Sequence, residues 1–278
     1  MTINTYADLV TAYKTNAKQF MTPIGKVSQG ADAATAPVIN WIQNGYPSAG
    51  AAPATKEAPT RDTVGAIYTE NPPAADNQYI LRFLAMQPTS ISAGMLLIDI
   101  LSWSAGLSGT TTGAQTTNLP TQALTRYTNG EGVLLGLICW SATGTTATTV
   151  TASYTNQAGT AGRTTTSVNF WTGGFGAGTV APSTQQVQLL PLQTGDYGVR
   201  SVESVTIAAS TGTAGNFGVV LLKPLVQASY ANDQPIEQDY VLQSSSLVEK
   251  EDSACLGLFA TGNSTVTSFY GKLVLVNG

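Results

Sequence analysis

Hydrophobic residues near the start of the chain repeat with the period of an α-helix. Thr5 and Asp8 have the spacing of a capping box, which marks a helix start, and Thr22-Pro23 marks the helix end. Between these limits, apolar side chains recur every three or four residues on one face: Leu9, Val10, Tyr13, Ala17 and Phe20. Because an apolar face needs a covering surface, we expect the helix to pack on the chain's own sheet or on a neighbouring subunit.

The next segment, from Gly45 to Pro73, is rich in alanine, proline and glycine. These residues oppose long helices and central strands. We interpret the segment as an extended arm or ordered linker, and the alternative is a long loop packed on its own domain. The expected organisation is an N-terminal helix plus a Pro/Ala-rich extended arm over residues 1–76, followed by a β-sandwich domain over residues 77–278.

After residue 76 the pattern changes to short apolar and aromatic runs, separated by Gly, Asn, Thr and Pro. Such runs, with hardly a helical pattern among them, predict antiparallel strands. The expected fold class is mainly β: an antiparallel, jelly-roll-like β-sandwich with the N-terminal helix and the extended arm. The expected strands cover residues 78–86, 94–103, 132–142, 147–156, 161–171, 185–193, 198–210, 217–225, 253–262 and 265–276.

The run at residues 94–103 contains a charge that needs an explanation. Its side chains alternate between two faces, and Asp99 shares its face with Met95 and Leu97. A carboxylate in an apolar strand is costly unless it is paired. We expect a structural salt bridge, for which Arg82 and Arg126 are the possible partners.

The middle of the chain is almost free of charge. Asn156–Gly159 is flanked by two strand-like runs, which predicts a hairpin with a glycine-containing turn. Arg163 is the only charged residue between Glu131 and Asp196. Threonine suits a pleated surface, but exposed sheet edges are usually guarded by charges. This pattern favours edges and faces that partner subunits cover in the working state.

Composition narrows the function classes. Charged residues make up 10% of the chain and hydrophobic residues 42%, enough to bury a core. The net charge of -4 and the absence of a basic patch argue against nucleic-acid binding. No apolar run is long enough to predict a membrane span. The acidic segment Gln227–Asp252 is interpreted as a solvated connection.

Candidate chemistry is sparse. The chain has no histidine, which removes histidine-based catalysis and histidine metal sites, and Cys139 and Cys255 are expected to be buried thiols, although a disulfide between them stays open. We therefore expect no cofactor, no metal and no enzymatic activity. Two alternatives remain open: a carbohydrate-binding module that uses Trp and Tyr faces, and a glycoside hydrolase that uses a carboxylate pair. The carboxylates for such a pair are Asp99, Glu131, Asp196 and Glu203.

Three phrases of the sequence resemble a group of tailed-bacteriophage and prophage virion structural proteins. They are "LSWSAGLSGTTTGAQTTNLP" from Leu101, "ASYTNQAGTAGRTTT" from Ala152 and "LLPLQTGDYGVRSVESVTIAASTGTAGNFGVVLLKPL" from Leu189. The resemblance spans roughly Leu101 to Leu225 and carries no catalytic signature.

The resemblance implies an assembly role in a virion built in the cytoplasm of a host bacterium. The leading interpretation is a capsid decoration or cement protein that binds the shell through β-edge and arm contacts. The alternative is a structural protein of the neck, tail or baseplate. The implied partners are the major capsid protein or other virion proteins, with a homo-oligomer, possible as a trimer, also expected. The candidate partner-interface residues are Leu9, Val10, Tyr13, Phe20 and Trp41.

Overall fold

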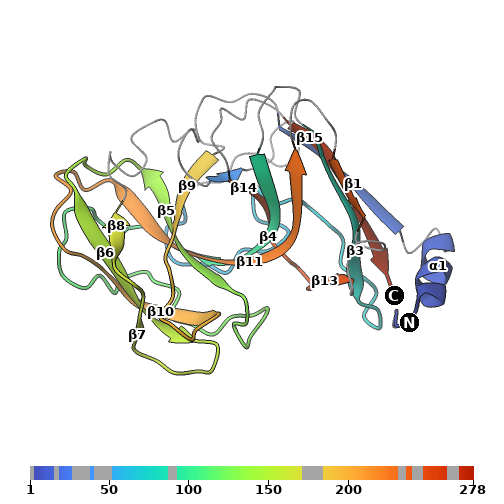
Figure 1. The fold of residues 1–278 in the computed structure, drawn as a ribbon, viewed down its shortest axis with the longest axis horizontal. Helices are drawn as coiled ribbons and strands as arrows, with labels where there is room; N and C mark the ends of the chain where they lie inside the picture. Colours follow the sequence, from blue (N-terminus) through green and yellow to red (C-terminus); the bar gives the residue numbers. More distant parts are fainter. Residues whose placement is uncertain are drawn as a thin grey trace.

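The computed structural model describes residues 3–15, 19–26, 38–40, 52–86, 93–170, 184–230, 236–239, 247–261 and 269–278. Over these residues the chain is mainly β, with antiparallel strand pairs and one short N-terminal helix, which confirms the predicted fold class. Figure 1 shows the layers side by side: a small sheet, a closed barrel, a second sheet and the helix α1. Both chain ends lie at the α1 end.

The central layer is a barrel that six of the described strands close. Going round it, the strands follow the order β11, β4, β14, β2, β9 and β5. Their bounds are β2 Val38–Asn40, β4 Ala93–Trp103, β5 Leu134–Ser141, β9 Thr184–Leu189, β11 Asn216–Tyr230 and β14 Leu256–Thr261. The long strand β11 pairs with β5 through its first half and with β4 along most of its length.

One outer layer, which we call the small sheet, covers the β5 side of the barrel. It contains β6 Thr148–Asn156, β7 Arg163–Thr164, β8 Val168–Phe170 and β10 Val199–Ile207, with β10 and β7 on either side of β6. The predicted hairpin is confirmed, because β6 pairs with β7 and β8, and Gly159 in the turn has a φ of 81°. The largest core cluster lies between this sheet and the barrel and contains Tyr154, Phe170 and Phe217.

The other outer layer, the terminal sheet, packs on the opposite side of the barrel. Its strands are β1 Gln19–Lys26, β3 Gln78–Met86, β12 Ile236–Asp239, β13 Val248–Lys250 and β15 Phe269–Asn277. Ile80 and Leu275 face the barrel residues Leu97 and Leu256. The helix α1, Tyr6–Lys14, lies on the sheet's other face, where Leu9 packs against apolar side chains of β3 and β15.

Two predictions need correction here. The helix has the expected capping box of Thr5 and Asp8 but ends at Lys14, and Phe20 with Thr22-Pro23 belongs to β1. Pairing with β15, which lies far away in the sequence, satisfies the backbone of residues 19–26 and overrides the local helical pattern. The segment Gln227–Asp252 is likewise no plain solvated connection, because it contains the end of β11 and the strands β12 and β13.

Burial on both faces explains the near-continuous apolar runs of the barrel strands. In β4, Leu97 faces the terminal sheet, whereas Ile98 and Ile100 face the barrel interior with Phe259. The predicted two-face alternation of this strand is therefore confirmed, and each face meets a different core. Gly218 permits a close crossing within this packing, since a Cβ there would lie 1.9 Å from the carbonyl oxygen of Ser104.

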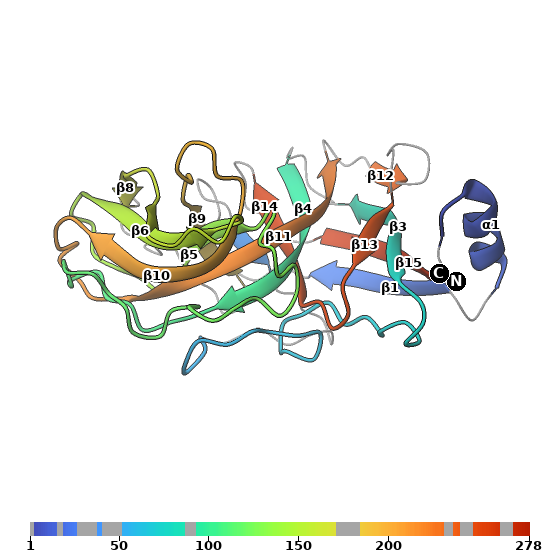
Figure 2. The same cartoon turned by 90° about the horizontal axis from the view of Figure 1, so that it is seen from below.

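The Pro/Ala-rich segment lies along the body of its own chain over its described part, residues 52–76. Glu57 pairs with Trp103 and Ile67 with Leu256, and Ala66 and Ile67 are buried. Figure 2 shows this light-blue segment running below the barrel. The alternative of a loop packed on its own domain therefore fits residues 52–76, while the division of the chain at residue 76 stays a prediction.

Candidate functional site

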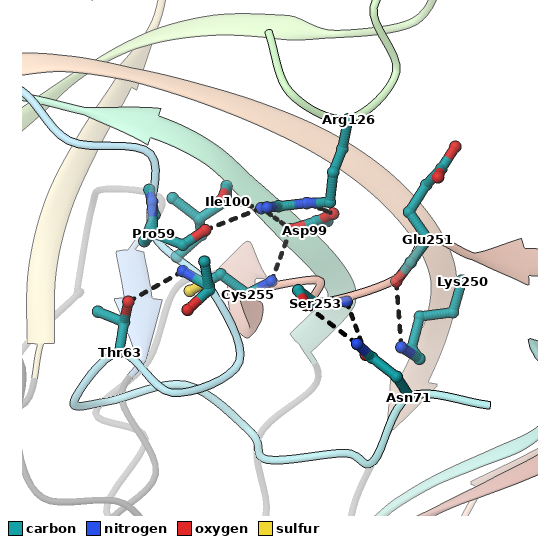
Figure 3. A network of polar contacts seen from close by, with 11 residues as sticks. Pro59, Thr63, Asn71, Asp99, Ile100, Arg126, Lys250, Glu251, Ser253 and Cys255 are labelled. Carbon is teal, nitrogen blue, oxygen red and sulfur yellow. Dashed lines mark hydrogen bonds and ion pairs between the residues drawn. The ribbon is translucent and has the colours of Figure 1, made fainter. Parts of the chain in front are cut away.

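The charge in β4 forms a buried ion pair, and its partner is Arg126. Nε and Nη2 of Arg126 lie 2.8 and 2.9 Å from the two carboxylate oxygens of Asp99, and the Cys255 N–H donates to Asp99 Oδ1 at 2.9 Å. Arg126 Nη2 also donates to the carbonyls of Pro59 and Ile100 (Figure 3). Burial raises the pKa of Asp99, and the ion pair with Arg126 opposes this effect. The predicted structural salt bridge is confirmed.

A second network holds the only charge of the threonine-rich stretch. Arg163 binds both carboxylate oxygens of Asp196, at 2.9 and 3.2 Å. Tyr154 donates its hydroxyl to Asp196 at 2.5 Å, and the Asn156 amide donates at 2.7 Å. These donors lower the pKa of Asp196 to about 2, with the Arg163 bond as the largest cause. The network ties the β6–β7 hairpin to the loop before β10.

The four carboxylates of the hydrolase alternative have separate environments. Among the described residues, Asp99 and Asp196 are bound by different arginines, and Glu203 accepts from hydroxyls on the small sheet. The Glu131 carbonyl accepts from the Lys223 ammonium at 2.7 Å. The donors described for Asp99, Asp196 and Glu203 differ, and the described bond of Glu131 involves its backbone carbonyl rather than its carboxylate.

The edge strand β10 is covered by its own chain. Gln115 and Val205 exchange backbone hydrogen bonds of 2.9 and 3.1 Å, and the Val202 N–H donates to the Pro120 carbonyl at 3.2 Å. Near the strand's start, the Val199 N–H donates to the Gly130 carbonyl at 3.1 Å. The expectation that partner subunits cover this edge is therefore wrong at these positions, because the loop after β4 supplies the missing backbone partners.

The outer face of the small sheet carries mostly hydroxyl side chains, and we call it the hydroxyl face. In β6 the inward residues are buried and the outward ones are half-buried. Thr151 lies opposite Thr206 of β10, and Ser153 lies opposite Ser204. The face consists of Thr149, Thr151, Ser153, Thr155, Thr164, Asn169, Ser201, Glu203, Ser204 and Thr206.

Glu203 is the charged residue of β10 that the hydroxyl side chains of this face bind, and the half-buried Arg200 precedes it on the same strand. Its carboxylate accepts from Thr155 Oγ1 at 2.6 Å and from Ser201 Oγ at 3.1 Å, with Ser153 Oγ at 3.5 Å. These short side chains hold the carboxylate against the sheet. The face is therefore polar, and most of its side chains are short and uncharged. The sequence analysis did not predict this face: it noted only that threonine suits a pleated surface, and the β-bulges of β10 place Ser201 and Glu203 there.

The predicted partner-interface residues divide between buried and exposed positions. Leu9 is buried on the terminal sheet of its own chain, and Val10 is half-buried beside it. Tyr13 is 46% exposed on α1, and Phe20 lies opposite Leu275 in the β1–β15 pair. Trp41 lies outside the described residues. Of the two surfaces expected to cover the helix, the chain's own sheet is the one that covers Leu9.

The aromatic platform expected for sugar binding receives no support from the two described tryptophans. Trp103 and Trp140 pack edge to face with ring centres 5.5 Å apart; Trp103 is buried in the barrel core, and the half-buried Trp140 packs against that core. The Trp103 indole donates to the Glu57 carboxylate, and the Trp140 indole donates to the Ser104 carbonyl at 2.8 Å. Trp41 and Trp171 lie outside the described residues.

Neither the two cysteines nor any group of possible metal ligands forms a reactive centre among the described residues. Cys139 and Cys255 are buried thiols outside any disulfide, as predicted, and burial raises the pKa of the Cys139 thiol to about 12. Within the described ranges, no three or more His, Cys, Asp or Glu side chains gather to hold a metal ion. In the same ranges, no helix has the length and apolar character needed to cross a membrane.

Comparisons with known proteins give no family. No protein-family model and no curated protein matches the chain. Among solved structures, one of infectious bursal disease virus, Gx strain, shares 8% identity over 94% of this chain and 82% of that chain, with a TM-score of 0.18. The VP2 subviral particle of that virus shares 7% identity over 93% and 81%, with a TM-score of 0.17. Likeness this slight carries no argument about this chain.

Proposed function

We propose that this chain is a structural protein of a tailed-phage virion, most specifically a capsid decoration protein that docks through the hydroxyl face. The sequence resemblance over Leu101–Leu225 supports the virion role, and this range contains the whole small sheet. The observation that carries the docking surface is the outward face of β6 and β10, which carries mostly hydroxyl side chains, with Arg200 and Glu203 as the half-buried charged residues of β10. The proposal assigns no reaction to the chain.

The hydroxyl face fits a protein partner for two physical reasons. Threonine and serine lose little side-chain entropy on burial, whereas lysine and glutamate lose much more. A face with few charges also avoids most of the desolvation cost of docking. Repetition over many equivalent positions on a particle adds avidity even where each contact is weak.

The alternative role in the neck, tail or baseplate uses the same surface but a different number of copies. Quantitative mass spectrometry of purified particles separates the two. A copy number that matches the many equivalent positions of a shell supports decoration, and a few copies per particle support the neck or baseplate. Absence of the chain from purified particles contradicts the virion role itself.

The docking surface is tested by placing charge at its centre. We expect Thr151→Lys combined with Thr206→Lys to reduce incorporation into particles at least about tenfold, because two adjacent ammonium groups would have to be buried at the interface. Thr160→Lys, in the exposed turn beyond β6, is the matched control and should be incorporated normally. Unchanged thermal unfolding of the double variant excludes a folding defect, and its normal incorporation contradicts docking through this face.

A further inference from the structure

Tyr197 lies in the loop between β9 and β10, beside the small sheet. The residue is 61% exposed, more than Tyr13 or Tyr68. Single exposed aromatic residues are common on protein surfaces, so exposure alone indicates no binding role. What distinguishes Tyr197 is the support of its backbone and the position of its loop.

The backbone of Tyr197 is held on both sides. Its N–H donates to Gln157 Oε1 at 3.2 Å, and its carbonyl accepts from the Gly132 N–H at 3.0 Å. The residue before it, Asp196, is fixed by the network with Arg163 described above. A firmly held loop therefore presents the aromatic ring, so a partner that binds it orders little besides the ring itself.

The other exposed tyrosines of the described chain have different surroundings. The Arg61 guanidinium lies over the Tyr68 ring, 5.2 Å from its centre, so one face of that ring is already covered. Tyr6 and Tyr13 belong to α1, at the opposite end of the molecule from the small sheet (Figure 1). Among these exposed tyrosines, Tyr197 is thus the one that lies at the small sheet.

The loop of Tyr197 lies at one end of the hydroxyl face. Gln157, which accepts the Tyr197 N–H, directly follows the last residue of β6, and Tyr197 lies two residues before the start of β10. These two strands carry the face, and Ser201 lies opposite Thr155 at this end. In protein interfaces, tyrosine and arginine often supply most of the binding energy, whereas serine and threonine rarely do. The short side chains of the face provide no such anchor, and Tyr197 is placed beside them.

A fixed positive charge lies next to this loop. The Arg200 guanidinium donates to the Gln157 carbonyl at 3.0 and 2.5 Å, and its Nε also donates to the Asn129 carbonyl at 3.2 Å. Among the described residues, no carboxylate forms an ion pair with Arg200. Gln157 holds both residues, Tyr197 through its side chain and Arg200 through its carbonyl. The exposed tyrosine and the guanidinium are therefore tied to the same point of the β6–β7 turn.

We propose that Tyr197 is the anchor of the docking surface, with Arg200 beside it; this inference rests on the function proposed above. The partner that it fits is a virion protein with an apolar pocket for the tyrosine ring and a carboxylate at the rim of that pocket for Arg200. Burial of the ring supplies apolar area that serine and threonine lack. The carboxylate supplies the counter-charge that the described chain does not give to Arg200. The hydroxyl face packs around the anchor and excludes water from it.

Competition for incorporation tests the anchor with the full chain. A tagged variant and the untagged wild type are expressed together during phage growth, and their ratio in purified particles is measured by mass spectrometry. Relative to a tagged wild type, we expect Tyr197→Ala to be reduced at least about tenfold and Tyr197→Phe less than about twofold, because the ring carries the contact. Tyr68→Ala is the matched control and should be incorporated normally. The unfolding midpoint of Tyr197→Ala should equal that of wild type, because Tyr197 is bonded through its backbone.

The same competition with the hydroxyl-face variant separates this inference from the proposed function. Normal incorporation of Tyr197→Ala, with loss of the Thr151→Lys and Thr206→Lys double variant, contradicts the anchor and leaves the docking face in place. The reverse result supports contact at Tyr197 and contradicts docking through the hydroxyl face. Normal incorporation of both contradicts the docking surface as a whole. Thr160→Lys serves as the control for both, because Thr160 leads into β7, on the other side of β6 from β10.

Two further measurements test the charge and the partner. Retention of the wild-type chain on purified particles should fall as the sodium chloride concentration rises, because salt screens the ion pair of Arg200. Retention that is independent of salt would remove Arg200 from the anchor. Particles that contain Tyr197→Ala at the wild-type level but adsorb less to host cells would show that Tyr197 contacts the host surface, and this result would overturn the proposal.

Discussion

The buried ammonium of Lys250 predicts a measurable dependence of stability on pH. Burial is the main cause that lowers its pKa from 10.5 to about 8. This difference corresponds to roughly 3 kcal/mol of preference for the neutral form in the folded state. Between pH 8 and pH 10.5 the unfolded chain keeps a proton that the folded chain has lost, so the free energy of unfolding rises with pH across this window.

Replacing Lys250 with methionine isolates this contribution. Methionine has a similar unbranched shape and no charge, so at pH 7 we expect Lys250→Met to be more stable than wild type by about 2 kcal/mol, after allowing for the lost bond to Glu251. Above pH 10.5 the advantage should vanish, because the wild-type amine is then neutral in both states. The assay is urea unfolding at pH 7 and pH 10.5 in buffer free of phosphate and sulfate.

The test compares the free energies of unfolding of variant and wild type at each pH, because other groups that also titrate in this range contribute equally to both proteins. Lys56→Met is the control for the loss of one positive charge, and its effect should be small at both pH values. The reasoning is refuted if Lys250→Met changes the free energy of unfolding equally at pH 7 and pH 10.5. A destabilised variant at pH 7 would show that the ammonium has a strong partner in solution.

Three further predictions follow from the packing and the ion pairs. Gly218→Ala should prevent native folding, because its Cβ would lie 1.9 Å from the carbonyl oxygen that follows β4, whereas Gly113→Ala has open space and should leave the unfolding midpoint unchanged. Asp99→Asn should cost about 3–5 kcal/mol in urea unfolding because Arg126 is left buried without its counter-charge, and adding Arg126→Met should recover most of this loss. The carboxyl carbon of Asp196 should titrate by NMR at about pH 2, and a midpoint near 4 would contradict its network. Since its folded pKa is lowered, its stabilising effect is present above pH 4 and is lost as the pH falls toward 2.

Local sequence patterns predicted most of the barrel and small-sheet strands because those strands carry their own signals, but they missed β2 and joined β7 and β8 into one strand. The β4 alternation placed Asp99 on the correct face, and Arg126 was among the partners it suggested. The glycine-containing turn after β6 also followed from local sequence. In each case the residues that determine the local structure lie within one strand or one turn, so pairing with distant segments does not change the structure that they predict.

The terminal sheet was harder to predict because its edge strands depend on distant partners. β1 contains Pro23 and follows a helical pattern, and only its pairing with β15 makes it a strand. The short strand β13 lies in an acidic segment, where Glu249 and Glu251 suggest solvent, yet Lys250 between them is buried opposite Gln78. No sequence signal marked that reversal, because burial of Lys250 depends on a partner strand from far earlier in the chain.

The scarcity of charge in the middle of the chain now has a more specific explanation than covered edges. The one charge of that stretch, Arg163, connects the hairpin to the loop before β10 by binding Asp196, and Arg200 just beyond the stretch donates to the Gln157 carbonyl at 2.5 and 3.0 Å. The strand edge that lacked protective charges is closed by the chain's own backbone at Gln115. The backbone groups bonded at this edge are therefore not available to pair with a second chain, whereas the outward side chains of the hydroxyl face are half-buried in the chain itself. The threonines and serines of the hydroxyl face are short and already held by the sheet. Docking of a partner there would therefore cost little side-chain entropy. A low entropy cost favours a contact that is weak by itself and repeated many times.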